Sequence, residues 1–233
     1  MTHSDDLERL GESTQRLLHT VASISGPEWT APSVLPGWSR AHVVAHLALN
    51  AEGMAGAVAA VLHGGSSPLY TSNEDRDGDV EKLSGEPSAV VGERLERASG
   101  RLGTALSALT PDLMDAEIER TPGGPRFPVQ GLARTRRREV EVHHADLGLG
   151  YTHGDWPTDF AIELIERVAH DRAGQGPLTL RASDAGRQWS LGEPGGTSVS
   201  GTVRDLGWWL SGRGGADSLA PDPGDVPSLG RWR

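Results

Sequence analysis

Apolar residues recur at helical spacing through the first two thirds of the chain. The first such run covers residues 5 to 25, follows an Asp/Ser-rich start and ends at Gly26-Pro27, which predicts an amphipathic helix. Ser39 is a suitable N-cap for a second helix, rich in Ala, Val and Leu, that ends at Gly64-Gly65. Because this second segment is apolar nearly all round, we expect it at the centre of its domain.

Two further helices are predicted before residue 150. Residues 66 to 86 are polar and acidic and favour a loop with a short helix, whereas residues 88 to 109 carry a third amphipathic stripe that ends at Thr110-Pro111. A connection rich in Pro and Gly over residues 111 to 127 leads to a fourth helix over residues 128 to 147, closed by Gly148. Four helices joined in this way predict a bundle.

The pattern changes after Trp156-Pro157. A fifth helix is expected through Asp171, followed by strand-like segments at 178–182, 187–191 and 197–201, a helix over 202–211 and an irregular tail from Gly214. The sequence therefore predicts an α+β protein, with a helical bundle in residues 1–152 and a small α/β domain in residues 153–233.

Composition narrows the choice of partners and chemistry. The net charge of -10 opposes binding to nucleic acid or to anionic lipid, and the absence of cysteine excludes disulfides, thiolate zinc sites and a cysteine nucleophile. No apolar run approaches the roughly 20 residues that span a bilayer, and the N-terminus is unlike a signal peptide. We expect a cytoplasmic monomer or weak homodimer that acts on small molecules.

Two pairs of metal-ligand residues lie on predicted helices. His42 and His46 are four residues apart, as are Glu139 and His143, and this spacing places both members of a pair on one helical face. A bundle that brings the two helices together can therefore assemble a His/Glu/His site with room for water. Nitrogen and oxygen ligands without sulfur suit Zn²⁺ best, with nickel, manganese and iron as alternatives. Hydrogen-bonded core histidines are the competing interpretation.

Helix geometry also discriminates between neighbouring residues. Glu139 shares a face with His143, whereas Glu141 lies roughly opposite and is expected in solvent. By the same criterion His143 is preferred to His144.

Arginines are the candidate anion-binding groups. A run of four on the fourth helix is interpreted first as a solvated face that pairs with nearby glutamates, and second as a contact to an anionic ligand: Arg134, Arg136, Arg137 and Arg138. Arg76, in an acidic segment, and Arg213 have the same two interpretations, as surface residues or as contacts to an anionic ligand. Glycines on both sides of Arg213, including Gly214, let backbone N–H groups approach a ligand.

Several motifs together resemble one family. Leu35-Pro-Gly-Trp-Ser-Arg-Ala-His-Val-Val-Ala-His46 and Arg138-Glu-Val-Glu-Val-His-His-Ala-Asp-Leu-Gly148 resemble the two signatures of the mycothiol-dependent maleylpyruvate isomerase family. Residues 68–72 with Arg76 resemble its mid-chain loop, and residues 207–214 resemble its C-terminal helix and glycine turn. The likeness spans nearly the whole chain.

The resemblance implies a fold and a set of site residues. It implies a DinB-like four-helix bundle that holds a divalent metal, usually zinc, followed by a small α/β domain. The metal ligands correspond to His46, Glu139 and His143. The resemblance further implies that Arg76 and Arg213, with Gly214, contact carboxylate groups of the substrate or of the thiol.

The resemblance also implies a reaction. A small thiol, mycothiol or another such as ergothioneine, becomes more thiolate-like near Zn²⁺ and adds to the cis double bond of maleylpyruvate, a small dicarboxylate. Rotation about the resulting single bond and elimination then give fumarylpyruvate. Three alternatives remain open: a thiol S-transferase acting on another electrophile, a non-catalytic metal-binding or stress protein, and a metal-dependent hydrolase.

Overall fold

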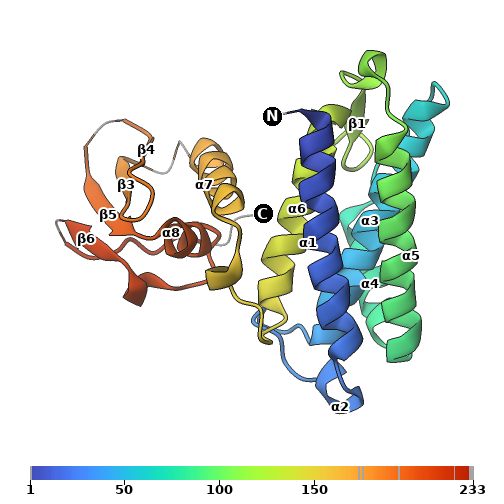
Figure 1. Cartoon of the computed structure of the whole chain (residues 1–233), viewed down its shortest axis with the longest axis horizontal. Helices are drawn as coiled ribbons and strands as arrows, with labels where there is room; N and C mark the ends of the chain where they lie inside the picture. The colour runs from blue at the N-terminus through green and yellow to red at the C-terminus, as the bar shows by residue number, and fades with distance from the viewer. Residues whose placement is uncertain (1, 173, 175, 194, 223, 231–233) are drawn as a thin grey trace. The chain divides into compact units, whose positions relative to one another are not determined.

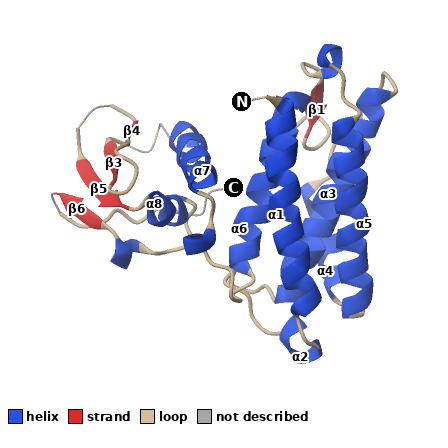
Figure 2. Ribbon diagram, viewed as in Figure 1, coloured by secondary structure: helices blue, strands red, loops and turns tan. Residues whose placement is uncertain are grey.

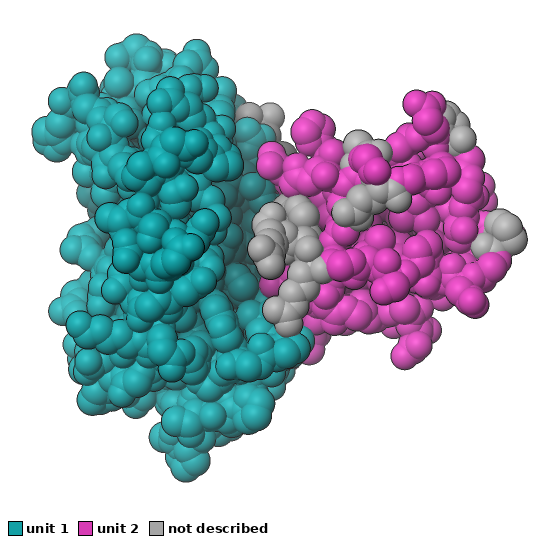
Figure 3. All heavy atoms as spheres, turned by 180° about the vertical axis from the view of Figure 1, so that it is seen from behind, with its two compact units in different colours: residues 1–149 teal, residues 150–233 magenta. Residues whose placement is uncertain are grey.

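The structure is a computed structural model that describes residues 2–172, 174, 176–193, 195–222 and 224–230. It divides into two compact units, residues 1–149 and residues 150–233, which are coloured separately in Figure 3. The boundary expected from the sequence lay at residue 152. Helices precede a region of mixed helices and short strands, and the fold is therefore α+β, as the sequence predicted.

The first unit is a bundle of long helices (Figure 1). Its helices are α1 (His3–Ser23), α2 (Gly26–Trp29), α3 (Arg40–Leu62), α4 (Asn73–Ser84), α5 (Ser88–Ser107) and α6 (Leu132–Asp146). Helix α3 contacts α4, α5 and α6, and α1 contacts α5 and α6. Buried residues occupy consecutive positions of α3 from Val43 to Ala48, so this part of the helix is enclosed on every side, in agreement with its predicted central position.

Helix α3 also corrects one expectation. In the described part of the chain it is the one helix long and apolar enough to cross a membrane by length and composition, although we expected none, and 61% of that stretch is buried. The prediction was based on uninterrupted apolar runs. Single polar residues interrupt the runs of α3 but lower its average hydropathy only slightly. The buried core helix of a bundle meets the same criterion, so this feature is weak evidence for a membrane span.

The connection before α6 contains more structure than the sequence suggested. Strands β1 (Glu117–Glu119) and β2 (Arg126–Pro128) form an antiparallel hairpin in which Ile118 is fully buried, and short 3₁₀ turns cover Pro111–Leu113 and Val129–Gly131. Leu69 and Tyr70 donate backbone hydrogen bonds to Glu119 and Arg120, at 2.9 and 3.0 Å. Strands of three residues are too short for alternation to be recognised, and the hairpin was missed for this reason.

The second unit combines two helices with a small mixed sheet (Figure 2). Helices α7 (Thr158–Asp171) and α8 (Val203–Leu210) pack against each other and against the sheet. The strand order is β4-β3-β5-β6, with a parallel β3–β5 pair and two antiparallel pairs. The strands are β3 (Leu178–Ala182), β4 (Gln188–Leu191), β5 (Thr197–Gly201) and β6 (Ala220–Asp222).

The tail expected to be irregular from Gly214 is partly regular. Residues Ala216–Ser218 form a 3₁₀ turn, and β6 pairs with β5 from Ser198 to Ser200. Pro221 lies in the middle of β6 and Ala220 and Asp222 flank it, a composition disfavoured in strands but tolerated at a sheet edge. Pairing with β5, which a local pattern cannot reveal, therefore determines this strand.

Candidate metal centre

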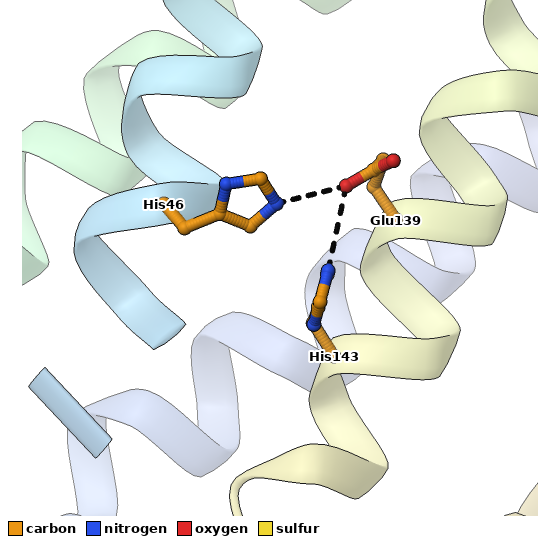
Figure 4. A group of neighbouring side chains, drawn as sticks. All are labelled: His46, Glu139 and His143. Carbon is orange, nitrogen blue, oxygen red and sulfur yellow. Dashed lines mark hydrogen bonds and ion pairs between the residues drawn. The ribbon is translucent and has the colours of Figure 1, made fainter. Parts of the chain in front are cut away.

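Three side chains from two helices converge on one point of the first unit (Figure 4). Nε2 of His46, on α3, lies 2.9 Å from Oε2 of Glu139, on α6, and Nε2 of His143 lies 3.5 Å from the same oxygen. The potential ligand atoms of the three residues all lie within 4.8 Å of one another. Glu139 and His143 are one helical turn apart, and the packing of α3 on α6 adds His46.

The group is enclosed on the side of the histidines and more open at the carboxylate. The side chains of His46 and His143 are 8% and 14% exposed, whereas that of Glu139 is 30% exposed. The Trp38 ring lies beside His46, with 5.7 Å between ring centroids. Of the three side chains, that of Glu139 is therefore the most accessible to a small molecule.

Asp146 fixes the orientation of one histidine. Its Oδ2 accepts a hydrogen bond from Nδ1 of His143 at 2.8 Å, and the Asp146 side chain is fully buried. With Nδ1 holding a proton, the neutral His143 ring presents the lone pair of Nε2 to the centre of the group. Nδ1 of His46 is buried and has no hydrogen-bond partner among the described residues.

The electrostatics couple the three residues. Burial lowers the pKa of His46, so that its ring is neutral near pH 7. Burial opposes the charged form of His143 too, but the hydrogen bonds with Asp146 and Glu139 prevail and raise its pKa. Loss of hydration alone would raise the pKa of Glu139, yet the hydrogen bonds from both histidines lower it well below the ordinary value.

This donor set fits a divalent metal ion. Two imidazole nitrogens and one carboxylate oxygen are the ligands of open zinc sites and of related transition-metal sites, and an outer carboxylate that orients a ligand histidine is a usual companion. Without an ion, the charge of Glu139 is stabilised by its hydrogen bonds with His46 and His143. The three residues could therefore hold an ion and leave coordination positions for a further ligand.

The other member of the first histidine pair lies outside this group. His42 contacts Oγ of Ser39 at 2.7 Å and Oε2 of Glu81 at 3.1 Å. Its place in the first turn of α3 explains these contacts, because Ser39 is the N-cap of the helix.

Two predictions about α6 were wrong. Glu141 is 1% exposed and accepts hydrogen bonds from Ser13 and Arg16, and it is not solvated. Arg136 and Arg137 are 1% and 4% exposed, so the arginine run is not a solvated face as a whole. Helix α6 contacts both α1 and α3 and thus has two buried faces.

Arg76 lies on α4, near the candidate metal group. Its guanidinium carbon is 6.0 Å from the centroid of the Tyr70 ring. Burial is the largest cause of the lowered pKa of His46, and the positive charge of Arg76 is a smaller one. Arg76 also lines a cavity of about 250 Å³ together with Leu49, Leu69 and Tyr70. Its side chain forms an ion pair with Asp77.

Arg213 and Gly214 lie in the second unit, directly after α8. Nη1 of Arg213 donates to the carbonyl oxygen of Ser211 at 3.2 Å. Gly214 has a φ of +94°, a left-handed value that favours glycine. The two residues therefore directly follow the turn at Ser211 and Gly212.

Several polar neighbours of the group were missed by sequence reasoning. They are Asp146, Asn50 and Tyr70. The first two had a usable signal, because each lies one helical turn from a proposed ligand: three residues after His143 and four after His46. Tyr70 had none, since its position depends on the hairpin.

Comparisons with known proteins agree with this architecture. The family model for the mycothiol maleylpyruvate isomerase N-terminal domain matches residues 10–148. Two solved structures, of the mycothiol-dependent maleylpyruvate isomerase and of a histidine-to-alanine mutant of it, share 26% and 25% of residues with this chain. Each has a TM-score of 0.91 and is matched over 100% of this chain and 98% of its own. None of the curated proteins matches the chain in sequence. The chain belongs to the mycothiol maleylpyruvate isomerase family of enzymes.

Proposed function

We propose that this enzyme isomerises maleylpyruvate to fumarylpyruvate with the help of a divalent metal ion and a small thiol. The observation that carries the proposal is the convergence of His46, Glu139 and His143 in a fold that matches a mycothiol-dependent maleylpyruvate isomerase along its whole length. Mycothiol is the first candidate for the thiol, and ergothioneine the second. Zn²⁺ is the first candidate for the metal.

His46, Glu139 and His143 would hold the ion. A divalent ion at this place supplies a Lewis acid that lowers the pKa of a bound thiol or water. Asp146 keeps the His143 ring in the orientation that this requires, through the bond to Nδ1.

The chain contains no cysteine, and the thiol therefore has to be a separate molecule. Reversible addition of a thiol to a cis alkene allows rotation about the former double bond before elimination restores it. The part of the protein is to bind and orient the substrate and to stabilise the negative charge that develops on it.

Arg76 is our first candidate for a substrate carboxylate. The support is its place in the 250 Å³ cavity and its electrostatic effect on His46. Arg213 and Gly214 are proposed, from the family resemblance, to bind a carboxylate of the substrate or of the thiol. This segment offers a guanidinium group and backbone N–H donors.

The test is ultraviolet monitoring of maleylpyruvate with metal-analysed enzyme in four parallel reactions, containing mycothiol, ergothioneine, glutathione or no thiol. We expect conversion with one thiol, none without it, and full recovery of the thiol afterwards. Stoichiometric loss of the thiol would identify an S-transferase. If bound metal stabilised the fold but no thiol supported turnover, a structural metal would be the better account.

A further inference from the structure

Tyr70 has a hydroxyl group that is oriented by a buried chain of hydrogen bonds. Nη1 of Arg136 donates to Oδ1 of Asn50 at 2.7 Å, and Nδ2 of Asn50 lies 3.0 Å from the Tyr70 hydroxyl oxygen. Arg136 and Asn50 are 1% and 4% exposed. The chain thus runs from α6 through α3 to the segment that precedes α4.

The direction of each bond follows from the chemistry of the donors. A guanidinium group only donates, so the atom of Asn50 that faces Arg136 has to be the amide oxygen, and the amide nitrogen faces Tyr70. That nitrogen also only donates, and the hydroxyl oxygen of Tyr70 therefore accepts. The hydroxyl proton remains, and no acceptor for it is found among the residues that the structure describes.

The backbone and the ring of Tyr70 are held as well. Its N–H donates to the carbonyl oxygen of Arg120. The guanidinium carbons of Arg120 and Arg76 lie 5.7 and 6.0 Å from the ring centroid. A donor fixed at its backbone, ring and hydroxyl oxygen loses little entropy when a ligand accepts its proton.

Tyr70 lies within electrostatic reach of the candidate metal group. Burial raises its pKa, and the negative charge of Glu139 raises it further, so the hydroxyl keeps its proton at neutral pH. Tyr70 lines the 250 Å³ cavity with Leu49, which follows His46 by one helical turn. This volume lies just below the usual range for ligand sites, about 300–1,000 Å³, and suits a small acid better than a complete thiol cofactor.

Arg136 adds an unusual feature to this region. It is a buried guanidinium with no carboxylate partner among the described residues, and its Nη2 has no hydrogen-bond partner. Burial lowers its pKa to about 10, which still leaves it positive at neutral pH. An unpaired buried cation is costly, and it favours negative charge on a ligand held nearby.

We propose that Tyr70 is a catalytic residue that donates a hydrogen bond to the ketone oxygen conjugated with the alkene of an unsaturated dioxo dicarboxylate, with Asn50 and Arg136 as its positioning residues. The inference rests on the proposed function. When a nucleophile adds to an alkene conjugated with a carbonyl group, the electron pair of the alkene moves to the carbonyl oxygen. A preoriented O–H group stabilises that charge without giving up its proton.

The first test removes the hydroxyl. Tyr70→Phe should lower kcat by on the order of 10²-fold, with metal content unchanged. Tyr151→Phe is the matched control, because Tyr151 is the other of the two tyrosines in the chain and lies in the second unit; it should keep kcat within about two-fold. A kcat within two-fold of the wild type in Tyr70→Phe would overturn the proposal.

The second test reverses one hydrogen bond without changing the shape of the side chain. In Asn50→Asp the new carboxylate still accepts the hydrogen bond from Arg136. It has no N–H group to donate to Tyr70, and it therefore accepts the hydroxyl proton of Tyr70 instead. We expect a loss of kcat similar to that of Tyr70→Phe. In the double variant the two losses should not add. Additive losses would show that Asn50 does not act through Tyr70.

A third measurement separates this proposal from the proposed function. Tyr151→Phe leaves Tyr70 as the only tyrosine, so labelling tyrosine with ¹³C at Cζ gives one NMR signal. We expect succinylpyruvate, the saturated and unreactive analogue of maleylpyruvate, to shift this signal in metal-loaded enzyme, and Asn50→Asp to abolish the shift. A shift without turnover of maleylpyruvate would retain Tyr70 as the donor and reject the isomerase. Turnover without a shift would retain the isomerase and reject Tyr70 as the donor.

Discussion

The two candidate histidine ligands are held in different ways. His143 has a carboxylate partner at Nδ1, whereas Nδ1 of His46 is buried without one. The protein therefore fixes one imidazole by a hydrogen bond and the other by packing against groups such as the Trp38 ring. Loss of either imidazole should leave the candidate metal site without one of its ligands.

Substitution of single histidines tests the ligand set. His46→Ala and His143→Ala should each lower metal content to below about a tenth of the wild-type value, because two remaining ligands bind weakly, and should abolish turnover. His42→Ala is the matched control on the same helix, and should retain metal because His42 contacts Ser39 and Glu81 instead. Metal content would be measured by mass spectrometry. Normal metal in His46→Ala would reject the set.

Metal affinity should depend on pH in a defined direction. In the metal-free protein His143 has a raised pKa and holds a proton that a metal has to displace, whereas His46 has a lowered pKa and is already neutral. The dissociation constant should thus rise about tenfold per pH unit as the pH falls below the pKa of His143. Competition with a chelator at several pH values measures this. A dissociation constant that is independent of pH from 6 to 8 would contradict it.

At this scale the sequence could predict which residues of α6 share one helical face. The four-residue spacing of Glu139 and His143 identified two residues of the group, and the choice of Glu139 over Glu141 agrees with the geometry. It went wrong for the far side of α6, because helical spacing cannot show that α1 covers that side. Glu141 and His144 are buried there against Ser13, Arg16 and Thr20.

At the scale of elements, α1 and α6 are joined by polar contacts as well as by packing. Glu141 links them most closely, with Ser13 and Arg16 as donors. Contacts between Asp6 and Arg134 and between Thr20 and His144 lie to either side along the two helices. The α1–α6 pair supports the helix that carries Glu139 and His143.

Glu141→Ala should therefore act on stability and not on metal binding. It leaves two donors without their acceptor, and we expect a loss of about 1–3 kcal/mol in the free energy of unfolding, with Arg16 partly exposed and so partly compensated by water. Urea denaturation measures the loss. Glu96→Ala, an exposed position on α5, is the control, and should change stability by no more than about 0.5 kcal/mol. If the Glu141→Ala protein lost its metal while it was still fully folded, the prediction would be contradicted.

A glycine on α3 allows the segment of Tyr70 to approach closely. A Cβ atom at Gly53 would lie 2.4 Å from the carbonyl oxygen of Leu69, whereas one at Gly56 would meet nothing within 4 Å. Backbone cannot yield as a side-chain end can, so Gly53→Ala has to displace residues 69 and 70.

We expect Gly53→Ala to cost about 1–3 kcal/mol of stability and to lower kcat together with it. Gly56→Ala, the same change three residues further along α3, should instead stabilise by up to about 1 kcal/mol through helix propensity. Thermal unfolding and turnover measure both effects. If both substitutions behaved alike, the close approach at Gly53 would not matter.

At the scale of the whole molecule, the long helices and three of the four described strands of the second unit, β3, β4 and β5, could be predicted from periodicity alone. The β1–β2 hairpin, β6 and the place of Tyr70 could not, since each depends on pairing with a segment distant in the sequence. The motifs quoted for the family resemblance lie in both units, which is why they were informative about the whole chain.

Arg213→Ala tests the contribution proposed for the second unit. It should raise the KM for substrate or thiol by about tenfold or more, because a lost charged hydrogen bond costs roughly 1.5–3 kcal/mol, and it should leave metal content unchanged. Arg187→Ala, which removes an exposed pair with Glu166 in the same unit, is the control. Steady-state kinetics and metal analysis measure both. An unchanged KM would remove Arg213 from the proposed binding residues.

The contact between His46 and Glu139 joins residues 93 positions apart in the chain. An ion held there would act as a reversible crosslink that closes a long loop of the bundle, and only the folded chain would offer all three ligands to it. Above the dissociation constant, each tenfold rise in free metal would add about 1.4 kcal/mol to the free energy of unfolding. The lifetime of the enzyme in a cell would then follow the supply of its metal, so that starvation for the ion would remove the protein and not merely silence it.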